Sequence, residues 1–227
     1  MKVAFAGPSL FGTDVANLSG VDRRGPAARG DIMRAIKDGA TEILLIDGMF
    51  GHCPSPGHKE ILFGLSRGVR IAGCASMGAL RATECQEIGM TGFGEIFEDY
   101  RDGRRVSDAD VAVVHAPGAL HWRPLSLALV DIDATLLRMR HLFDAAAAES
   151  ISRAARSIHY TERSLASILA VAGLDSQAEN LFKDVLFSQK AADAKLGLAH
   201  LRTGLPRHHP VEFEETFSSQ ADRKIYL

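Results

Sequence analysis

The stretch HKEILFGLSRGVRIAGCASMGALR, residues 58–81, decides the fold that we expect for this chain. Its pattern predicts a helix from about Gly57 to Arg67, a buried strand from Val69 to Cys74, and a second helix that starts at Met77. An apolar strand between two helices is typical of α/β proteins, whose parallel strands are covered on both faces. The stretch therefore predicts an α/β fold with a mostly parallel sheet flanked by helices.

Two further apolar runs, 2–7 and 42–48, are predicted to be strands of the same sheet. The segment 9–30 between them is rich in glycine, proline, serine and arginine, and it is long for a loop. The glycines of 89–94 predict a flexible connection. Shorter elements are expected as helices over 31–38 and 95–101 and as strands over 110–115 and 126–130.

The composition changes from about residue 133 onward, where alanine, leucine and charged residues recur with a helical period. We expect helices near 133–157, 161–172, 175–187 and 189–203. The predicted organisation is an α/β core with the catalytic site over 1–132, an α-helical C-terminal subdomain over 133–204, and a polar tail over 205–227.

Composition and charge exclude several classes of protein. The chain has 227 residues, 46% of them hydrophobic, and a formal net charge of −2, which argues against a dedicated nucleic-acid binder. No uncharged apolar run approaches the roughly 18–20 residues of a membrane span, and the apolar run before Pro8 is too short for a secretory signal. The three cysteines, Cys53, Cys74 and Cys85, have no metal-ligand spacing. We therefore expect a cytoplasmic protein without a metal site or other cofactor.

The central stretch places Lys59 and Ser76 at the starts of successive helices. On a helical wheel Lys59 lies beside Leu62 and Phe63, at the edge of the expected buried stripe. Burial and the helix dipole both favour a neutral lysine, which is a competent general base. Ser76 follows a strand and precedes a helix, with Gly78 two residues on, and this layout is typical of a nucleophile elbow. Backbone N–H groups at Met77 and Gly78 could then hold an oxyanion.

Each of these residues also has a purely structural interpretation. Lys59 could pack its stem against the protein with its amine in water, and Ser76 could simply N-cap the second helix. Arg81 could pair with Glu84 within the helix or hold the carboxylate of a ligand. Cys74 could carry sulfur as a thiolate, or it could be inert packing inside a strand.

Several motifs in order along the chain resemble the TfuA-like family. They are Ile46-Asp47-Gly48-Met49-Phe50, His58-Lys59-Glu60-Ile61-Leu62, Ala75-Ser76-Met77-Gly78-Ala79-Leu80-Arg81-Ala82, Ile88-Gly89-Met90-Thr91-Gly92, Tyr100-Arg101-Asp102-Gly103 and the segment 108–115. The resemblance spans about 70 residues and covers the helical half only loosely. Where the family commonly has Gly-Ala-Ser-Ser, this chain has Gly73-Cys74-Ala75-Ser76, so the serine is kept and a neighbouring hydroxyl is lost.

The resemblance implies a function in sulfur supply. TfuA-like proteins act beside YcaO-type enzymes, which make peptide backbone thioamides, and hydrolyse a thiocarboxylated ThiS-like sulfur carrier protein through a Ser–Lys pair. That pair maps onto Ser76 and Lys59. The matching motifs and the strand ends suggest substrate-binding roles for Asp47, His58, Arg81, Tyr100, Arg101 and His115.

We therefore expect a hydrolase that releases sulfide from the carrier, with the YcaO-type enzyme and the carrier as partners. The chain could also associate with copies of itself. Two other classes stay open at this point. One is a non-catalytic adaptor that positions YcaO and its peptide, and the other is a sulfurtransferase that uses Cys74.

Overall fold

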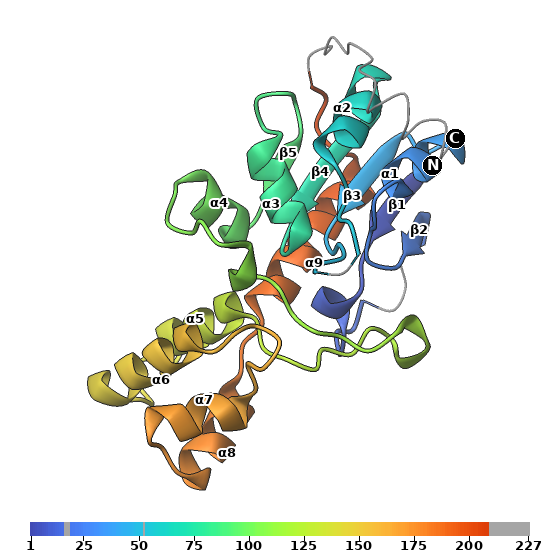
Figure 1. Cartoon of the computed structure of the whole chain (residues 1–227). Coiled ribbons are helices and arrows are strands. Elements are labelled where there is room, and N and C mark those ends of the chain that lie inside the picture. Colours follow the sequence, from blue (N-terminus) through green and yellow to red (C-terminus); the bar gives the residue numbers. More distant parts are fainter. Residues whose placement is uncertain (16–18, 52, 209–227) are drawn as a thin grey trace.

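The computed structural model describes residues 1–15, 19–51 and 53–208 of the chain. Its strands form one five-stranded sheet in the order β2-β1-β3-β4-β5, and every neighbouring pair is parallel (Figure 1). The strands are β1 (Lys2–Phe5), β2 (Val21–Arg24), β3 (Glu42–Leu45), β4 (Arg70–Cys74) and β5 (Thr91–Phe93). The sheet confirms the predicted α/β fold.

Four helices pack on one face of this sheet. They are α1 (Asp31–Lys37), α2 (His58–Ser66), α3 (Met77–Glu84) and α4 (Glu95–Arg101). Alternate strand residues such as Val3, Phe5 and Leu45 point into this layer, where they meet Ile61 of α2 and Leu80 of α3. Because side chains alternate along a strand, the residues between them must be covered from the other side.

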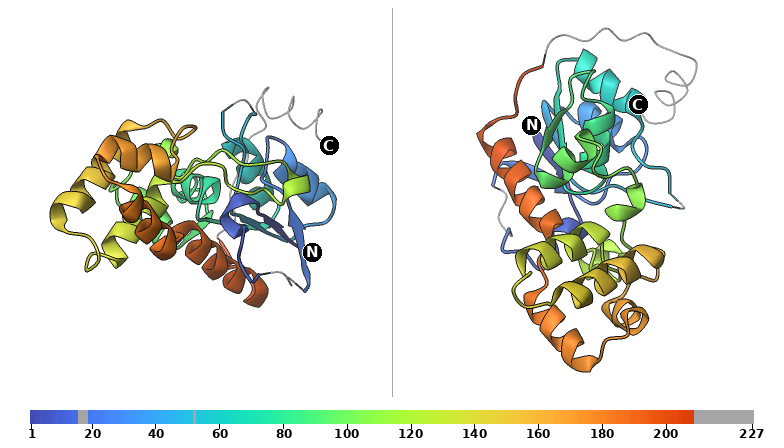
Figure 2. Two further views of the ribbon diagram at one scale, coloured as in Figure 1. Left: turned by 90° about the horizontal axis from the view of Figure 1, so that it is seen from below. Right: turned by 90° about the vertical axis from the view of Figure 1, so that its left-hand side faces the viewer.

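That second face is covered by α9 (Gln189–Thr203), the long helix near the end of the described chain (Figure 2). Ala194, Leu198 and Leu201 of α9 pack with Leu44 of β3 and Ala72 of β4 in a separate buried cluster. Part of the expected helical subdomain over 133–204 thus contributes directly to the core of the sheet.

The other C-terminal helices form a lobe beside the sheet (Figures 1 and 2). They are α5 (Leu129–Arg138), α6 (Ala145–Ser157), α7 (Leu165–Ala172) and α8 (Ser176–Val185). Ile132, Ile151, Ile168 and Phe182, one from each helix, are completely buried in their common core. The single helix predicted over 133–157 is divided, because α5 ends at Arg138 and α6 begins only after the N-cap Asp144.

Some of the predicted strands are wrong, and two strands were missed. Neither of the segments 110–115 and 126–130 forms a strand, and His115 makes an isolated antiparallel bridge with Pro124, which precedes the second segment. The Ser126 hydroxyl accepts a hydrogen bond from the Val114 N–H, so a side chain takes the place of a ladder bond. Conversely, β2 lies inside the predicted loop 9–30, and β5 inside the predicted connection 89–94.

The predicted polar tail starts as an anchored segment. The Leu205 N–H donates to Glu42 at 2.6 Å, and the Arg70 guanidinium donates to the Leu205 carbonyl at 3.0 Å. From residue 209 onward this predicted tail lies outside the described residues. Within the described ranges, no helix combines the length and the apolar character that a membrane span needs.

A close contact between two glycines fixes the start of α3 on the sheet. A Cβ atom on Gly78 would lie 1.8 Å from the Leu45 carbonyl oxygen, and one on Gly73 would lie 2.0 Å from the Gly78 oxygen. The Gly78 N–H donates to the Ile46 carbonyl at 3.1 Å, which ties the helix to the end of β3. Glycine is needed here because any side chain would separate the helix from the strands.

Candidate active site

The turn between β4 and α3 holds Ser76 in an unusual backbone arrangement. Ala75 has a φ of 65°, in the left-handed region that residues with a Cβ rarely adopt. The Ser76 N–H closes a tight turn by donating to the Cys74 carbonyl at 2.8 Å. Backbone strain of this kind persists only where the surrounding structure enforces it, and it is frequent at turns that present a nucleophile.

The side chain of Ser76 does not cap the helix that it precedes. It occupies the N-cap position, yet it makes no side-chain capping bond, and only 2% of the residue is exposed. Its hydroxyl instead donates a long hydrogen bond, 3.5 Å, to the Val111 carbonyl. The interpretation of Ser76 as an ordinary N-cap therefore finds no support in its contacts.

A lysine from the C-terminal helix reaches the same carbonyl oxygen. Lys190, in the first turn of α9, is 3% exposed, and its Nζ donates to the Val111 carbonyl at 2.8 Å. The Ser76 hydroxyl and the Lys190 amine thus converge on one acceptor and lie within about two hydrogen-bond lengths of each other. Burial lowers the pKa of Lys190, while the nearby carboxylates of Asp47 and Asp131 act in the opposite direction.

Asp47 organises the carboxyl ends of β1 and β3 beside this pair. Its buried carboxylate accepts hydrogen bonds from the Gly7 N–H at 2.8 Å, the Ser9 N–H at 3.0 Å and the Ser9 hydroxyl at 2.7 Å. In open parallel sheets ligands collect at the strand ends where the order reverses, which here lies between β1 and β3. Asp47 therefore lies at the carboxyl ends of the strands, where a ligand site is expected, and its carboxylate accepts its hydrogen bonds from Gly7 and Ser9.

The two predicted oxyanion donors differ in availability. The Gly78 N–H already donates to Ile46, so it cannot serve as the predicted donor without breaking that bond. The Met77 N–H is in the first turn of α3, where a helix provides no internal acceptor, and none of the described residues accepts from it. Of the two predicted donors, the Met77 N–H is thus the one without an acceptor within the described residues.

The side chain of Lys59 lies on the exposed face of α2, whereas the helical wheel places it at the edge of the buried face. The residue is exposed, whereas Glu60 is buried and accepts hydrogen bonds from the Gly30 and Gly57 N–H groups. The buried face of α2 is thus turned toward Glu60, and the expectation that Lys59 borders the buried stripe is wrong. Its neighbour His58 contacts Glu84, at the far end of α3, about 12 Å along the helix from Ser76.

Arg81, another predicted substrate-binding residue, makes its contacts within the protein. Arg81 binds the Pro56 carbonyl and the Ser55 hydroxyl, both at 2.7 Å, and also pairs with Glu84. Its guanidinium therefore holds the loop before α2 and forms the ion pair considered for it, and its role in binding a ligand carboxylate stays a prediction.

The remaining three predicted substrate-binding residues contact other parts of the protein. The Tyr100 hydroxyl donates to the Ser107 carbonyl at 2.6 Å, and Arg101 pairs with Asp102 on the surface. His115 stands edge-on to the Trp122 ring, with a centroid separation of 5.4 Å. The hydrogen bonds described for these three side chains do not reach Ser76.

Cys74 is inaccessible in this fold. It is 0% exposed, and its sulfur packs so close to α9 that a Cβ on Gly197 would lie 2.6 Å from it. Burial raises the pKa of the Cys74 thiol well above its usual value, and Asp193 and Asp47 add to this effect. A thiolate is therefore strongly disfavoured at this position.

A pocket of about 230 Å³ leads to the Lys190 side of the site. Ser9, Asp131 and Lys190 supply polar groups to its wall, and apolar residues such as Phe11 and Leu127 line the rest. Phe11 is 42% exposed at its rim, so the pocket opens to the surface. It gives access from the surface to the side chain of Lys190.

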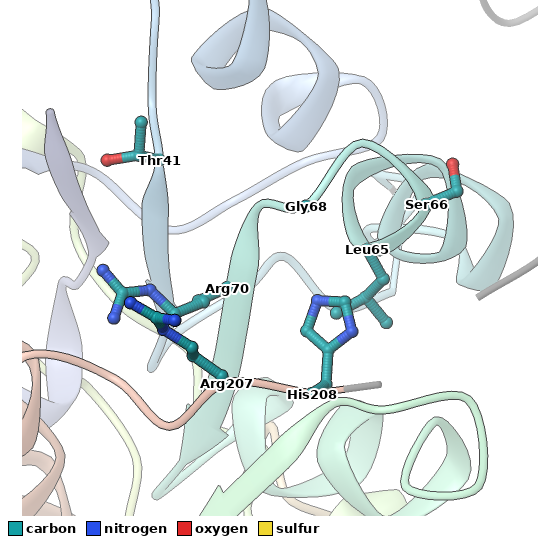
Figure 3. A pocket seen from close by; sticks show the side chains of 7 residues that line it. All are labelled: Thr41, Leu65, Ser66, Gly68, Arg70, Arg207 and His208. Atoms are coloured by element: carbon teal, nitrogen blue, oxygen red, sulfur yellow. The ribbon is translucent and has the colours of Figure 1, made fainter. Parts of the chain in front are cut away.

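Another hollow lies at the opposite ends of the strands (Figure 3). It measures about 430 Å³, and Arg70, Arg207 and His208 lie around it. Arg70 begins β4 and Thr41 precedes β3, so this hollow is at the amino ends of the strands. Because Ser76 follows the carboxyl end of β4, the hollow is separate from the site described above.

Sequence reasoning missed Lys190, and no signal in its local sequence indicates the contact with Val111. Ser188 caps the helix that carries Lys190, and its hydroxyl accepts from the Ala191 N–H. A lysine two residues after a cap has no special meaning in the sequence. Its proximity to Ser76 arises from packing between segments that are more than 100 residues apart.

Comparison with protein families accords with the motifs around this site. A family model described as TfuA-like protein matches residues 47–164, which is more than half of the chain. The matched region includes Ser76 and Val111 but ends before Lys190. No curated protein matches the chain significantly. The ordered motifs, the turn that carries Ser76 and the extent of this match establish that the chain belongs to the TfuA-like protein family.

Proposed function

We propose that this TfuA-like protein is a serine hydrolase that acts on the C-terminal thiocarboxylate of a ThiS-like carrier protein. It releases sulfide, which a YcaO-type enzyme uses to form thioamides in a peptide backbone. The observation that carries the proposal is the arrangement of Ser76. Its hydroxyl follows a strained turn, makes no helix cap, and lies beside a buried amine.

The reaction proceeds through an acyl-serine ester. A lysine takes the proton of the Ser76 hydroxyl as its oxygen attacks the thiocarboxylate carbon. The C–S bond then breaks, the sulfur leaves with that proton, and the ester remains on Ser76. Water cleaves the ester, so that thiocarboxylate and water become carboxylate and hydrogen sulfide, with no cofactor.

Charge that develops on the carbonyl oxygen needs a hydrogen-bond donor. The Met77 N–H is the candidate, because it starts a helix and has no acceptor within the described part of the chain. One such donor typically stabilises a transition state by about 3 kcal/mol. Sulfide is a good leaving group, so the reaction does not need a strong general acid.

The pocket beside Lys190 supports a chain end as the substrate. Its volume of about 230 Å³ admits a slender peptide terminus but not a folded surface. The apolar lining from Phe11 and Leu127 suits an extended peptide, and the buried Lys190 lies in its wall. A thiocarboxylate at the end of a carrier protein has this shape.

The family resemblance assigns the proton-accepting role to Lys59. That residue is exposed, whereas Ser76 is buried. Lys59 is carried by the turn of α2 next to His58, which contacts the far end of α3. The identity of the base is therefore open to a direct comparison of lysine variants.

The test is sulfide release from a ThiS-like carrier that carries a C-terminal thiocarboxylate. We expect Ser76→Ala to abolish turnover while thermal unfolding and binding to the carrier are retained. Cys74→Ala should keep turnover, because the buried thiol has no access to substrate. If Ser76→Ala still releases sulfide, the serine mechanism is wrong. If the natural chain releases none and only binds a YcaO-type enzyme, it is an adaptor.

A further inference from the structure

A buried lysine is expensive to keep unless its charge is paired or removed. Lys190 is 3% exposed, and within the described residues its amine forms no ion pair as close as 4 Å. Its hydrogen bond is to a neutral carbonyl, that of Val111. A buried amine without a carboxylate in contact is driven toward its neutral form, which has a lone pair that can accept a proton.

The neighbouring carboxylate is engaged in a different task. Asp131 accepts from the Lys190 backbone N–H at 3.0 Å and from the Ser188 hydroxyl at 3.1 Å. It therefore fixes the first turn of α9 against α5 and orients the lysine, rather than pairing with its amine. Asp47 contributes a second negative charge nearby, and its oxygens accept bonds from Gly7 and Ser9.

The Val111 carbonyl oxygen is an acceptor that the Ser76 hydroxyl and the Lys190 amine share. Both the Ser76 hydroxyl and the Lys190 amine point at the Val111 carbonyl oxygen, at 3.5 Å and 2.8 Å. The longer hydrogen bond, from Ser76, is the weaker one, so rotation of the Ser76 hydroxyl away from Val111 costs little free energy. After that rotation its proton can face the lysine nitrogen.

We propose that Lys190, rather than Lys59, is the general base that activates Ser76. This inference rests on the proposed function and adds to it a catalytic group from α9, outside the matched region 47–164. The Lys190 amine takes the Ser76 proton as the Ser76 oxygen bonds to the thiocarboxylate carbon. The resulting ammonium, held by Val111, returns the proton to the departing sulfur, and the amine then takes a proton from the water that cleaves the ester.

The first experiment compares lysine variants in two assays. One assay is sulfide release from a thiocarboxylated ThiS-like carrier, and the other is labelling of Ser76 by a fluorophosphonate, followed by intact mass. We expect Lys190→Met to slow both by at least about 100-fold, the usual contribution of a general base. Lys195→Met is the matched control, because Lys195 is on the same helix but pairs with Asp14 at the surface. It should leave both rates within about twofold.

Different outcomes separate this inference from the proposed function. If Ser76→Ala keeps turnover, the serine mechanism itself fails. If Ser76→Ala is inactive, Lys190→Met is active and Lys59→Met is inactive, only the assignment of Lys190 is overturned and the family assignment stands. Loss of activity in Lys190→Met with an unchanged Lys59→Met supports the proposal.

A second experiment tests the proposal without Lys190→Met, in case that variant folds poorly. The charged groups that face the Lys190 amine are Asp47 and Asp131, and both favour its protonated form. Since the neutral amine is the active form, kcat/KM should rise with pH through the pKa of Lys190. Asp131→Asn removes one negative charge, so this rise should move to lower pH. A merely structural Lys190 predicts a loss of stability without such a shift, and an unshifted profile would overturn the proposal.

Discussion

Substitution of Gly78 by alanine tests whether the close contact between α3 and the sheet holds Ser76 in place. The added Cβ would lie 1.8 Å from the Leu45 carbonyl oxygen, where an ordinary contact needs 3.4 Å or more. The first turn of α3 must therefore move outward by about 1.5 Å, since the obstacle is backbone that cannot rotate away. The movement also breaks the bond from the Gly78 N–H to Ile46.

Two contributions set the expected magnitude. Overpacking of a core costs about 1–3 kcal/mol, and a lost buried hydrogen bond adds about 1 kcal/mol. We expect the free energy of unfolding to fall by roughly 2–4 kcal/mol, and the melting temperature by about 5–15 °C for a chain of this size. Because Ser76 immediately precedes the displaced turn, its reaction with a fluorophosphonate should slow by about 100-fold, the usual effect of a 1 Å misplacement.

Urea unfolding followed by the fluorescence of Trp122, the single tryptophan, measures the stability change. Gly57→Ala is the matched control. Gly57 also begins a helix, has a φ of −88°, and its added Cβ would meet only the Glu60 carboxylate at 3.8 Å. That variant should stay within about 1 kcal/mol of the natural chain. A Gly78→Ala protein as stable and as reactive as Gly57→Ala would refute the reasoning.

Three further predictions concern buried groups away from the serine. Burial raises the pKa of Asp193 from 3.8 to about 6, so ionisation of this carboxyl destabilises the fold as pH rises from about 4 to 6. The Asp193→Asn variant lacks this ionisation. Between pH 4 and pH 7, its free energy of unfolding in urea should therefore rise by about 3 kcal/mol relative to that of the natural chain. Glu60→Gln should lose about 1–3 kcal/mol in calorimetry, because one amide oxygen cannot replace a carboxylate that accepts from both Gly30 and Gly57. Leu198→Ala should lose about 2–5 kcal/mol with an unchanged denaturant slope, because it opens a cavity between α9 and the sheet. The same pH dependence as the natural chain would contradict the prediction for Asp193→Asn. An unchanged melting temperature would contradict that for Glu60→Gln, and an unchanged denaturation midpoint that for Leu198→Ala.

The elements that sequence predicted best are those with strong apolar or capping signals. The strands around Ile43 and Ile71 are buried on both faces and stand out as continuous apolar runs. The last helix was predicted over 189–203 and is observed there, since Ser188 caps it and Gly204 ends it. In contrast, β2 lies at the edge of the sheet and consists mainly of charged residues, so its pattern carried no strand signal.

The site was harder to predict because its parts are distant in sequence. The turn that carries Ser76 is local, and its strand–turn–helix pattern was readable. The exposure of Lys59 was misjudged because Glu60 is buried to bind the Gly30 and Gly57 N–H groups, which a wheel based on hydrophobicity cannot foresee. Lys190 reaches the site only through the packing of α9 on the sheet, and nothing in its local sequence indicates that contact.

The position of α9 also has a consequence for synthesis on the ribosome. When the strands have emerged, the sheet face formed by residues such as Leu44, Ala72 and Cys74 has no cover until residues 189–203 follow. Contacts of such long sequence separation form slowly, because a long loop must close first. The nascent chain therefore carries Ser76 well before the helix that supplies Lys190, so a protein truncated before α9 would present an open apolar sheet face.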